Sequence, residues 1–209
     1  MTAFKLKDDD LVVSVIDNDG EEIFISTHNG IGLRFLLSEV GLTGCKASGV
    51  KGIGLKNDYV VSASVFSGND EFVCVVTEKS TGKRIRMSEF ERTSRARKGI
   101  QLIRDVKTNP YHIVKTFICE KCDLTIKVGN DFDVIKSTTL PIMDRYSTGS
   151  SICKGKISDV FINNGLIDSN NYNVVKKAEE EIETLDIKLD DIDEQIKKLK
   201  EFKNNVNRA

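Results

Sequence analysis

The sequence has few of the residues that break or cross-link a chain: no Trp, two Pro and five Cys among 209 residues. An odd number of Cys at irregular spacing does not fit a disulfide-bonded secreted scaffold and agrees better with a reducing cytoplasm. No run of 18 apolar residues is present, so the sequence predicts no membrane-spanning helix and no membrane partner. The first ten residues lack the apolar segment of a signal peptide, which argues against secretion. These absences predict a cytoplasmic protein.

What the sequence does contain is 39% apolar residues, enough for a core of ordinary size. They occur as short β-branched runs without a helical period, and turn signals such as Asp17-Asn-Asp-Gly20 and Asn29-Gly30 separate them. This pattern predicts an all-β domain. The expected strands are Leu11–Ile16, Ile23–Thr27, Leu33–Leu37, Val60–Phe66, Phe72–Thr77, Ile113–Ile118, Leu124–Val128, Val134–Lys136 and Val160–Ile162.

A repeat with an offset of 50 residues runs through the same region. The aligned pairs are Thr27 with Thr77, Gly32 with Gly82, Arg34 with Arg84, Ser38-Glu39 with Ser88-Glu89, and Gly49 with Gly99. A second step of 50 residues reaches Arg145 and Gly149, although Thr138-Thr139 replaces the Ser-Glu pair. We therefore predict a domain over residues 1–167, made of three units at about 8–57, 58–108 and 109–167. Each unit has about the length of a four-stranded propeller blade.

Two kinds of repeated residue need a physical reason. Gly49, Gly99 and Gly149 each follow a loop, which predicts a positive φ or a close approach of two main chains. Arg34 and Arg84 are interpreted differently: a cation that recurs on a strand has no evident packing role, which favours a ligand contact over a solvated strand face.

Positive charge is concentrated between Gly82 and Gly99. Residues 51–100 carry ten basic and six acidic side chains, residues 1–50 carry four and eight, and the whole chain has a formal charge of −1. A local excess of Arg indicates a polyanion partner, because guanidinium groups pair with phosphate oxygens in a forked geometry. The cations of this stretch are Lys83, Arg84, Arg86, Arg92, Arg95, Arg97 and Lys98.

The pattern changes after Asn170. Apolar residues then follow a strict heptad spacing over about four heptads, flanked by charged residues, which predicts one long α-helix over residues 171–204 within a segment 168–209. Its apolar face would meet another helix in a coiled coil or lie on a groove of the β domain; the period favours the coiled coil. The heptad residues are Val175, Ala178, Ile182, Leu185, Leu189, Ile192, Ile196 and Leu199.

Residues 5–165 resemble the C-terminal domain of the A subunit of bacterial type IIA topoisomerases. The segment from Phe72-Val-Cys-Val-Val-Thr77 through Gly82-Lys-Arg-Ile-Arg-Met-Ser-Glu-Phe90 to Arg95-Ala-Arg-Lys-Gly-Ile100 carries the resemblance, together with Gly49-Val-Lys-Gly-Ile-Gly-Leu55. Asp144-Arg-Tyr-Ser-Thr-Gly-Ser150 is similar to the closing repeat of topoisomerase IV A subunits from Gram-positive bacteria. The gyrase-type Gln-Arg-Arg-Gly-Gly-Lys-Gly box is absent, which favours the topoisomerase IV branch. Three units are visible where complete domains of this family have five or six.

The resemblance implies a β-pinwheel, a propeller-like disc of hairpin-exchanging blades whose basic rim binds and bends duplex DNA. It implies a non-catalytic module without a cofactor, in a cytoplasmic, chromosome-associated enzyme that relaxes and decatenates DNA at the expense of ATP. The implied partners are duplex DNA, the remaining domains of the A subunit and the ATPase B subunit. The alternative is a protein-interaction scaffold that oligomerises through residues 171–204. The predicted DNA-contacting residues are Arg34, Lys46, Lys51, Lys83, Arg84, Arg86, Arg92, Arg95, Arg97, Lys98, Lys136 and Arg145. In the third unit, Lys136 and Arg145 are weaker counterparts, as is Lys127.

Two further groups of residues bear on chemistry. Cys119-Glu-Lys-Cys122 has a zinc-like spacing, but no second pair at finger spacing exists and only Cys153 or a His remains as a remote ligand, so we assign no metal site. His28 and His112 do not suggest a pair, and each is interpreted as a turn or strand-face residue. None of the four Tyr stands in a recognisable catalytic setting, so the segment is expected to be non-catalytic.

Overall fold

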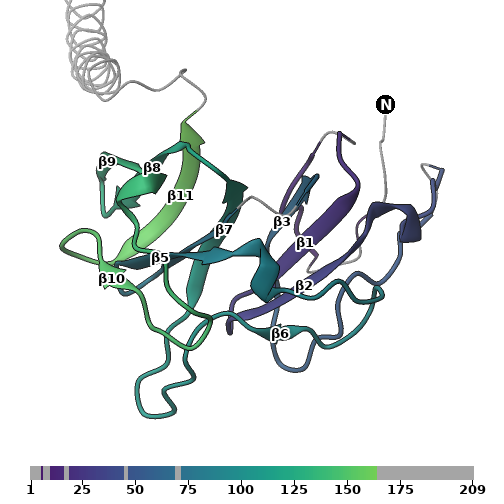
Figure 1. Ribbon diagram of the computed structural model, residues 1–209, viewed down its shortest axis with the longest axis horizontal. Helices are drawn as coiled ribbons and strands as arrows, with labels where there is room; N and C mark the ends of the chain where they lie inside the picture. The colour runs from purple at the N-terminus through teal and green to yellow at the C-terminus, as the bar shows by residue number, and fades with distance from the viewer. Residues whose placement is uncertain (1–5, 7–9, 17–18, 45–46, 69–71, 164–209) are drawn as a thin grey trace, which may run out of the picture. The chain divides into compact units, whose positions relative to one another are not determined.

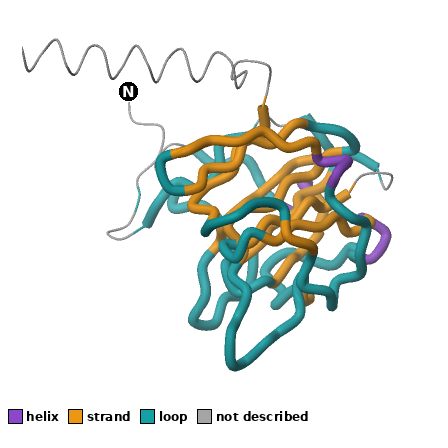
Figure 2. Tube along the Cα trace, turned by 90° about the vertical axis from the view of Figure 1, so that its left-hand side faces the viewer, coloured by secondary structure: helices purple, strands orange, loops and turns teal. Residues whose placement is uncertain are grey.

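The computed structural model describes residues 6, 10–16, 19–44, 47–68 and 72–163. The chain divides into two units, Met1–Asn164 and Gly165–Ala209, and the described residues all belong to the first. Their regular structure consists of eleven β-strands and three short 3₁₀ turns, which confirms the all-β prediction for this part of the chain (Figures 1 and 2). The predicted helix over residues 171–204 lies outside the described residues. No helix in the described part of the chain is long and apolar enough to span a membrane.

The strands form three antiparallel sheets, each built around a hairpin (Figure 1). The first sheet has the order β3-β1-β2-β6, the second β10-β5-β4-β7 and the third β11-β8-β9. The strand bounds are β1 (Glu22–Thr27), β2 (Ile31–Leu36), β3 (Val60–Phe66), β4 (Phe72–Thr77), β5 (Thr81–Arg86), β6 (Ile100–Gln101), β7 (Ile113–Cys119), β8 (Asp123–Val128), β9 (Asp131–Lys136), β10 (Ser150–Ser151) and β11 (Ile157–Asn163).

Each sheet is completed by strands that come later in the chain. The first sheet pairs the β1–β2 hairpin with β3 on one side and with the two-residue strand β6 on the other. The second sheet does the same with β7 and β10, and the third takes β11. The expected unit border near residue 57 therefore falls between β2 and β3, which both belong to the first sheet. The border near residue 108 falls between β5 and β7, which both belong to the second. This exchange fixes neighbouring sheets to each other, because every connection between hairpins also supplies a strand.

The three hairpins end in the same local structure, a 3₁₀ turn directly after the second strand: η1 (Leu37–Glu39), η2 (Met87–Glu89) and η3 (Ser137–Thr139). The residue after each turn donates its main-chain N–H to the carbonyl at the start of the turn, as Phe90 does to Met87. The repeated glycines behave as predicted: Gly49, Gly99 and Gly149 have φ values of 75°, 77° and 83°.

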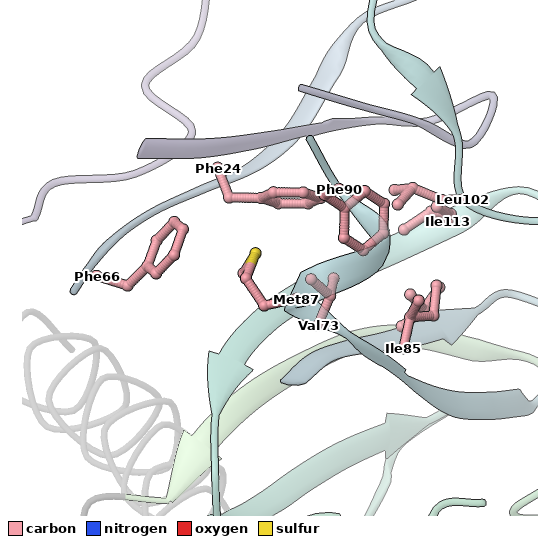
Figure 3. Close-up of a cluster of buried hydrophobic side chains, with 9 residues drawn as sticks. Phe24, Phe66, Val73, Ile85, Met87, Phe90, Leu102 and Ile113 are labelled. Atoms are coloured by element: carbon pink, nitrogen blue, oxygen red, sulfur yellow. The ribbon is translucent and has the colours of Figure 1, made fainter. Parts of the chain in front are cut away.

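Buried apolar side chains form clusters that include residues of neighbouring sheets. Phe24 of the first sheet and Phe90, which follows η2, meet edge to face with centroids 5.0 Å apart, and Val73, Ile85 and Met87 pack in the same cluster (Figure 3). A second cluster joins Cys74 and Val76 to the third sheet. Burial of shared apolar surface is therefore the main attraction that holds one sheet against the next.

One strand prediction is wrong. Leu11–Ile16 has no regular structure although it is β-branched, and Leu11 and Val15 are 85% and 90% exposed. The segment touches the first sheet through Ser14, whose Oγ accepts a hydrogen bond of 3.4 Å from the Ala63 main-chain N–H. An apolar alternating run becomes a strand only where a sheet edge pairs with it, and no strand in the described part of the chain does so here.

Candidate nucleic-acid interface

The repeated arginine Arg34 points between two sheets and not to solvent. It lies on β2, is 7% exposed, forms an ion pair with Glu22 and donates from Nη1 to the carbonyl oxygens of Phe90 and Met87 at 3.2 and 3.4 Å. Its guanidinium also lies over the Phe66 ring, 5.5 Å from the centroid. Arg34 thus binds the turn that follows the next hairpin, and the prediction that it contacts DNA is corrected.

Arg84, 50 residues later, repeats this contact one sheet further along. Its Nε donates to the Leu140 carbonyl at 3.0 Å and its Nη2 to the Thr138 carbonyl at 3.2 Å. Both acceptors belong to the turn after the third hairpin. A repeated cation therefore does have a packing reason: its guanidinium group donates to main-chain carbonyls in and just after the 3₁₀ turn of the next hairpin.

Lys83 is the most buried of the predicted DNA contacts, at 1% exposure. Its Nζ donates to the carbonyls of Asp144, Arg145 and Ser147 at 2.8, 3.2 and 2.8 Å. Burial lowers the pKa of Lys83 to about 8, and the charge of Asp144 opposes that shift. An ammonium group with all three donors used inside the protein has none left for a phosphate, so the assignment of Lys83 to a DNA-contacting surface is wrong.

Arg95 and Arg145 are half-buried and hold main chain in place. Arg95 donates from Nη1 to the carbonyl of Lys51, and its main-chain N–H donates to Glu39 Oε2 at 2.8 Å. Arg145, at the equivalent position 50 residues on, donates from Nη1 to the Gln101 carbonyl at 3.3 Å and lies 3.9 Å from Glu89. These two arginines shape loops, and any contact they make with a ligand uses only part of the guanidinium group.

Several exposed cations lie near two segments that are distant in the sequence but joined by main-chain hydrogen bonds. The Ala96 N–H donates to the Gly52 carbonyl at 2.7 Å, and the Gly54 N–H donates to the Arg97 carbonyl at 2.8 Å. This pairing brings the connection after the first hairpin beside the loop over residues 91–99. We use the name basic corner for four exposed cations near this pairing: Lys51, Arg92, Arg97 and Lys98.

The basic corner borders a cleft of about 440 Å³ over β2. Arg97 and Lys98 line the cleft together with Phe90, Thr93 and Ser94. Arg97 is exposed, and its Nε donates to Ser94 Oγ at 3.4 Å. Arg92 Nη1 lies 3.5 Å from Glu22, and the Arg92 side chain is 55% exposed. Arg97 and Lys98 therefore offer a guanidinium and an ammonium group at one open cleft, and such donors suit an anion.

The remaining predicted residues lie apart from the basic corner. Arg86 and Lys136 are exposed at the ends of β5 and β9, and Arg86 lies over the Phe72 ring, 5.9 Å from its centroid. Lys127, the weaker candidate, is half-buried and lies over Phe132. Lys46 lies outside the described residues.

One exposed cation, Arg104, was not predicted from the sequence, although it occupies the position equivalent to Gly54 in the next unit. The Arg104 N–H contacts the Ser147 carbonyl at 3.5 Å, as the Gly54 N–H contacts the Arg97 carbonyl in the preceding unit, and the Arg104 side chain is exposed. The 50-residue offset, applied to Gly54, leads directly to Arg104 and was the signal available. A second pair of adjoining segments thus carries positive charge beside β10.

His28 and His112 do form a pair, contrary to the prediction. Their rings stack with centroids 4.3 Å apart, and Tyr59 stacks on the other face of His28 at 4.6 Å. Burial and the nearby His112 lower the pKa of His28. No group of three or more His, Cys, Asp or Glu suited to a metal ion is found among the residues the structure describes.

Comparison with known proteins assigns these features to a family. The family model for the DNA gyrase C-terminal domain, beta-propeller, matches residues 21–67 and 71–120. The A subunit of DNA topoisomerase 4 from Bacillus subtilis (strain 168) is 39% identical over 154 residues, which are 72% of this chain and 19% of that protein. The corresponding subunit from Streptococcus pyogenes serotype M3 (strain MGAS315) is 40% identical over 110 residues, covering 52% of this chain and 13% of the relative.

A solved structure agrees with the sequence relatives. The crystal structure of the C-terminal domain of DNA topoisomerase IV matches with a TM-score of 0.73 at 34% identity, over 78% of this chain and 53% of that chain. The chain spans about a fifth of the length of the Bacillus relative and about half of the crystallised domain. The fold of the crystallised domain is therefore shared over 78% of this chain.

Proposed function

We propose, from the premise that this chain belongs to the family of DNA gyrase C-terminal β-propeller domains, that it is a non-catalytic module binding and bending duplex DNA in a type IIA topoisomerase. In that role it presents DNA segments to the cleavage core of a topoisomerase IV A subunit during ATP-dependent relaxation and decatenation. The remaining domains of that subunit and the ATPase B subunit are then its protein partners.

The basic corner is the observation that carries this proposal. Lys51, Arg92, Arg97 and Lys98 are exposed, and main-chain hydrogen bonds between residues 52–54 and 96–97 hold their segments together. Cations fixed on a rigid scaffold can contact successive phosphates without reading base sequence. The inward cations Arg34, Lys83 and Arg84 support the same function indirectly, because they fix the angle between neighbouring sheets and hence the curvature of the surface that DNA follows.

The electrostatic character of the surface limits the expected affinity. Glu91 stands next to Arg92, and the chain as a whole carries a formal charge of −1. Phosphate contacts release counterions, so log K falls with log salt by about 0.9 for each phosphate neutralised. We therefore expect modest, sequence-independent affinity that depends steeply on salt.

The test compares two charge-reversed double variants of the whole chain. Arg97→Glu with Lys98→Glu alters the basic corner, while Lys121→Glu with Lys154→Glu makes the same change in net charge at exposed residues elsewhere. Gel-shift titrations on duplexes of roughly 40 base pairs, at several salt concentrations, measure affinity and the salt slope. The first variant should bind at least about tenfold more weakly, with a salt slope lower by about 2. Equal losses in both variants would place the interface elsewhere.

A further inference from the structure

Four of the five cysteines meet at one place, between the second and third sheets. Cys74 on β4 is fully buried, and Cys119, Cys122 and Cys153 pack, partly buried, against the same apolar cluster. DNA binding by the basic corner uses none of them. The cluster is therefore a group of potentially reactive side chains that the proposed function leaves unexplained.

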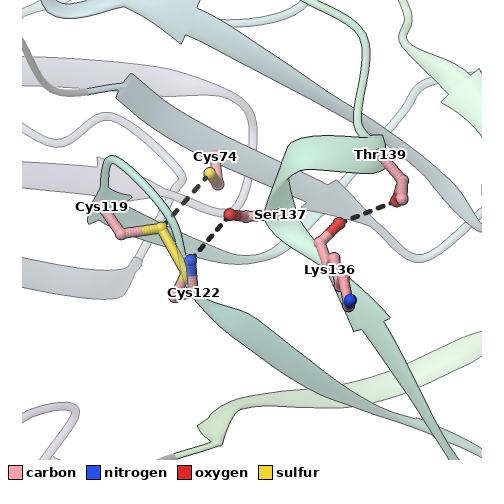
Figure 4. The surroundings of a disulfide bond; sticks show 6 residues. All are labelled: Cys74, Cys119, Cys122, Lys136, Ser137 and Thr139. Carbon is pink, nitrogen blue, oxygen red and sulfur yellow. Dashed lines mark hydrogen bonds between the residues drawn. A yellow bond between two sulfur atoms is a disulfide. The ribbon is translucent and has the colours of Figure 1, made fainter.

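Cys119 and Cys122 are joined by a disulfide across the link from one sheet to the next (Figure 4). Cys119 is the last residue of β7 in the second sheet, and Cys122 directly precedes β8 in the third. Between them, Glu120 and Lys121 are exposed, so solvent reaches the turn that carries the two sulfur atoms. A pair of cysteines separated by two residues at a half-exposed turn is accessible to small thiols and disulfides.

Cys122 is anchored independently of its sulfur. Its main-chain N–H donates to Ser137 Oγ at 2.9 Å (Figure 4). The Ser137 N–H donates in turn to the Cys122 carbonyl at 2.7 Å. Ser137 is fully buried at the start of η3. Because this reciprocal pair fixes the main chain on one side and β7 fixes it on the other, the two sulfurs stay close whether or not they are bonded.

The third thiol lies near the disulfide but is poorly placed to exchange with it. Cys74 Sγ is 3.7 Å from Cys119 Sγ, and burial raises the pKa of the Cys74 thiol to about 12. On β4, Cys74 pairs with Phe117, whereas Cys119 pairs with Phe72, so Cys74 and Cys119 are diagonal neighbours. Diagonal neighbours on paired strands lie about 7–8 Å apart, beyond the usual Cα–Cα span of a disulfide, about 4.4–6.8 Å. Cys74 thus remains a protonated thiol while its neighbours react.

We propose that Cys119 and Cys122 form a reversible redox site, oxidised by low-molecular-weight disulfides and reduced by thiols, at the junction of the second and third sheets. In the oxidation, the thiolate of one cysteine attacks a small disulfide RSSR, forms a mixed disulfide and releases one RSH after protonation. The second cysteine attacks the protein sulfur of the mixed disulfide and releases the other RSH. Two protein thiols are oxidised and one RSSR is reduced to two RSH.

The site fits a reducing compartment, which is the setting expected from the cysteine content. There a disulfide is transient and follows the thiol–disulfide balance, so the junction would be cross-linked only under oxidative conditions. The ring closed by the disulfide spans four residues, and the chain-entropy gain from so short a ring is small. The expected consequence is a local change in the protection of the residue 119–123 turn, and not a change in the fold.

The experiment equilibrates the whole chain in buffers of varied reduced-to-oxidised glutathione ratio, quenches with acid and alkylates the free thiols for peptide mass spectrometry. The expected product is the Cys119–Cys122 disulfide, formed in buffers that leave Cys74 and Cys153 alkylatable after unfolding. Cys122→Ser should instead accumulate a single glutathione adduct on Cys119. Cys153→Ser is the matched control, since it removes a cysteine of the same cluster, and it should leave the titration midpoint unchanged.

Three results would overturn the proposal. The first is that Cys119 and Cys122 stay reduced even in fully oxidised glutathione. The second is pairing of either residue with Cys74 or Cys153. The third is stoichiometric zinc in the protein as purified without chelator, released when Cys119 or Cys122 is replaced, because the pair would then be a metal site. Hydrogen exchange of the residue 119–123 amides in both redox states gives a readout that does not depend on DNA binding.

Discussion

Arg34 and Phe90 are 56 residues apart, yet the Arg34 guanidinium donates a hydrogen bond of 3.2 Å to the Phe90 carbonyl. The same relationship recurs between Arg84 and Leu140, again 56 residues apart, at 3.0 Å. The repeated arginine therefore makes the same contact between neighbouring sheets in the first two units. Val134 stands at the corresponding place in the third unit, where a side chain without donors cannot make this bond.

Arg34→Ala should destabilise the fold strongly, since it leaves the buried Glu22 carboxylate without its main partner. Breaking a buried ion pair from one side costs about 3–5 kcal/mol, and urea unfolding followed by circular dichroism measures the loss. Arg92→Ala is the control, because Arg92 contacts the same carboxylate from an exposed position and should cost under about 1 kcal/mol. Similar losses in both variants would contradict the assigned role of Arg34.

The lowered pKa of Lys83 predicts that the free energy of unfolding rises at alkaline pH. Its pKa in the folded protein is about 8, below the ordinary value of 10.5, so the unfolded chain binds the proton more tightly. Stability should therefore increase as the pH rises from about 8 to 10.5, where the unfolded chain also loses its proton. Unfolding curves of the wild type and Lys83→Met across this range give a difference that isolates Lys83. A difference that does not vary with pH would show that Lys83 keeps its ordinary pKa.

The histidine stack predicts a loss of stability at mildly acidic pH. The pKa of His28 lies below its ordinary value of 6.5, so the unfolded chain takes up a proton first and stability should fall as the pH drops below 6.5. His112→Phe keeps a ring at the stacking position but removes a charge that lowers the pKa of His28. NMR titration of His28 should then show its midpoint moving towards 6.5. An unchanged midpoint would mean that burial alone sets it.

Gly99 is predicted to tolerate no side chain. It has a φ of 77°, and a Cβ there would lie 2.5 Å from the Gly32 carbonyl oxygen, where β2 meets β6. Gly49 has a φ of 75° with nothing within 4 Å, so Gly49→Ala measures the cost of the backbone conformation alone, about 1–2 kcal/mol. Gly99→Ala should cost about 2 kcal/mol more, because overpacking adds to it. Equal costs in thermal unfolding would show that β6 can move away freely.

Much of the fold followed from the sequence because strands and turns are local. β-branched runs placed eight of the nine expected strands, and the glycine at each loop end indicated its positive φ correctly. The exceptions have specific causes. Leu11–Ile16 has strand composition but no paired edge among the described residues. β5 (Thr81–Arg86) was not among the expected strands, because cations interrupt its apolar residues. β6 and β10 are two-residue strands, and they follow Gly99 and Gly149, where a side chain would collide with the main chain of Gly32 and Gly82.

The candidate site could be predicted less well from the sequence than the fold. A sequence shows how many cations lie in a stretch but not which way each one points, and along β5 the neighbours Lys83 and Arg84 both turn to main-chain carbonyls of the third unit. Arg97 and Lys98 are exposed because they lie on a loop whose own main chain is already bonded to residues 52–54. The sorting of cations into internal and external ones needed coordinates.

The sequence by itself determined the all-β class, the 50-residue repeat and the concentration of positive charge after Gly82, since each depends on residue type and spacing along the chain. Only the tertiary structure decided that Arg34, Lys83 and Arg84 join sheets, that His28 stacks on His112, and that the cysteines share one cluster. The physical reason is the exchange of strands between sheets. It brings together residues of neighbouring repeat units, and no pattern within one repeat records that contact.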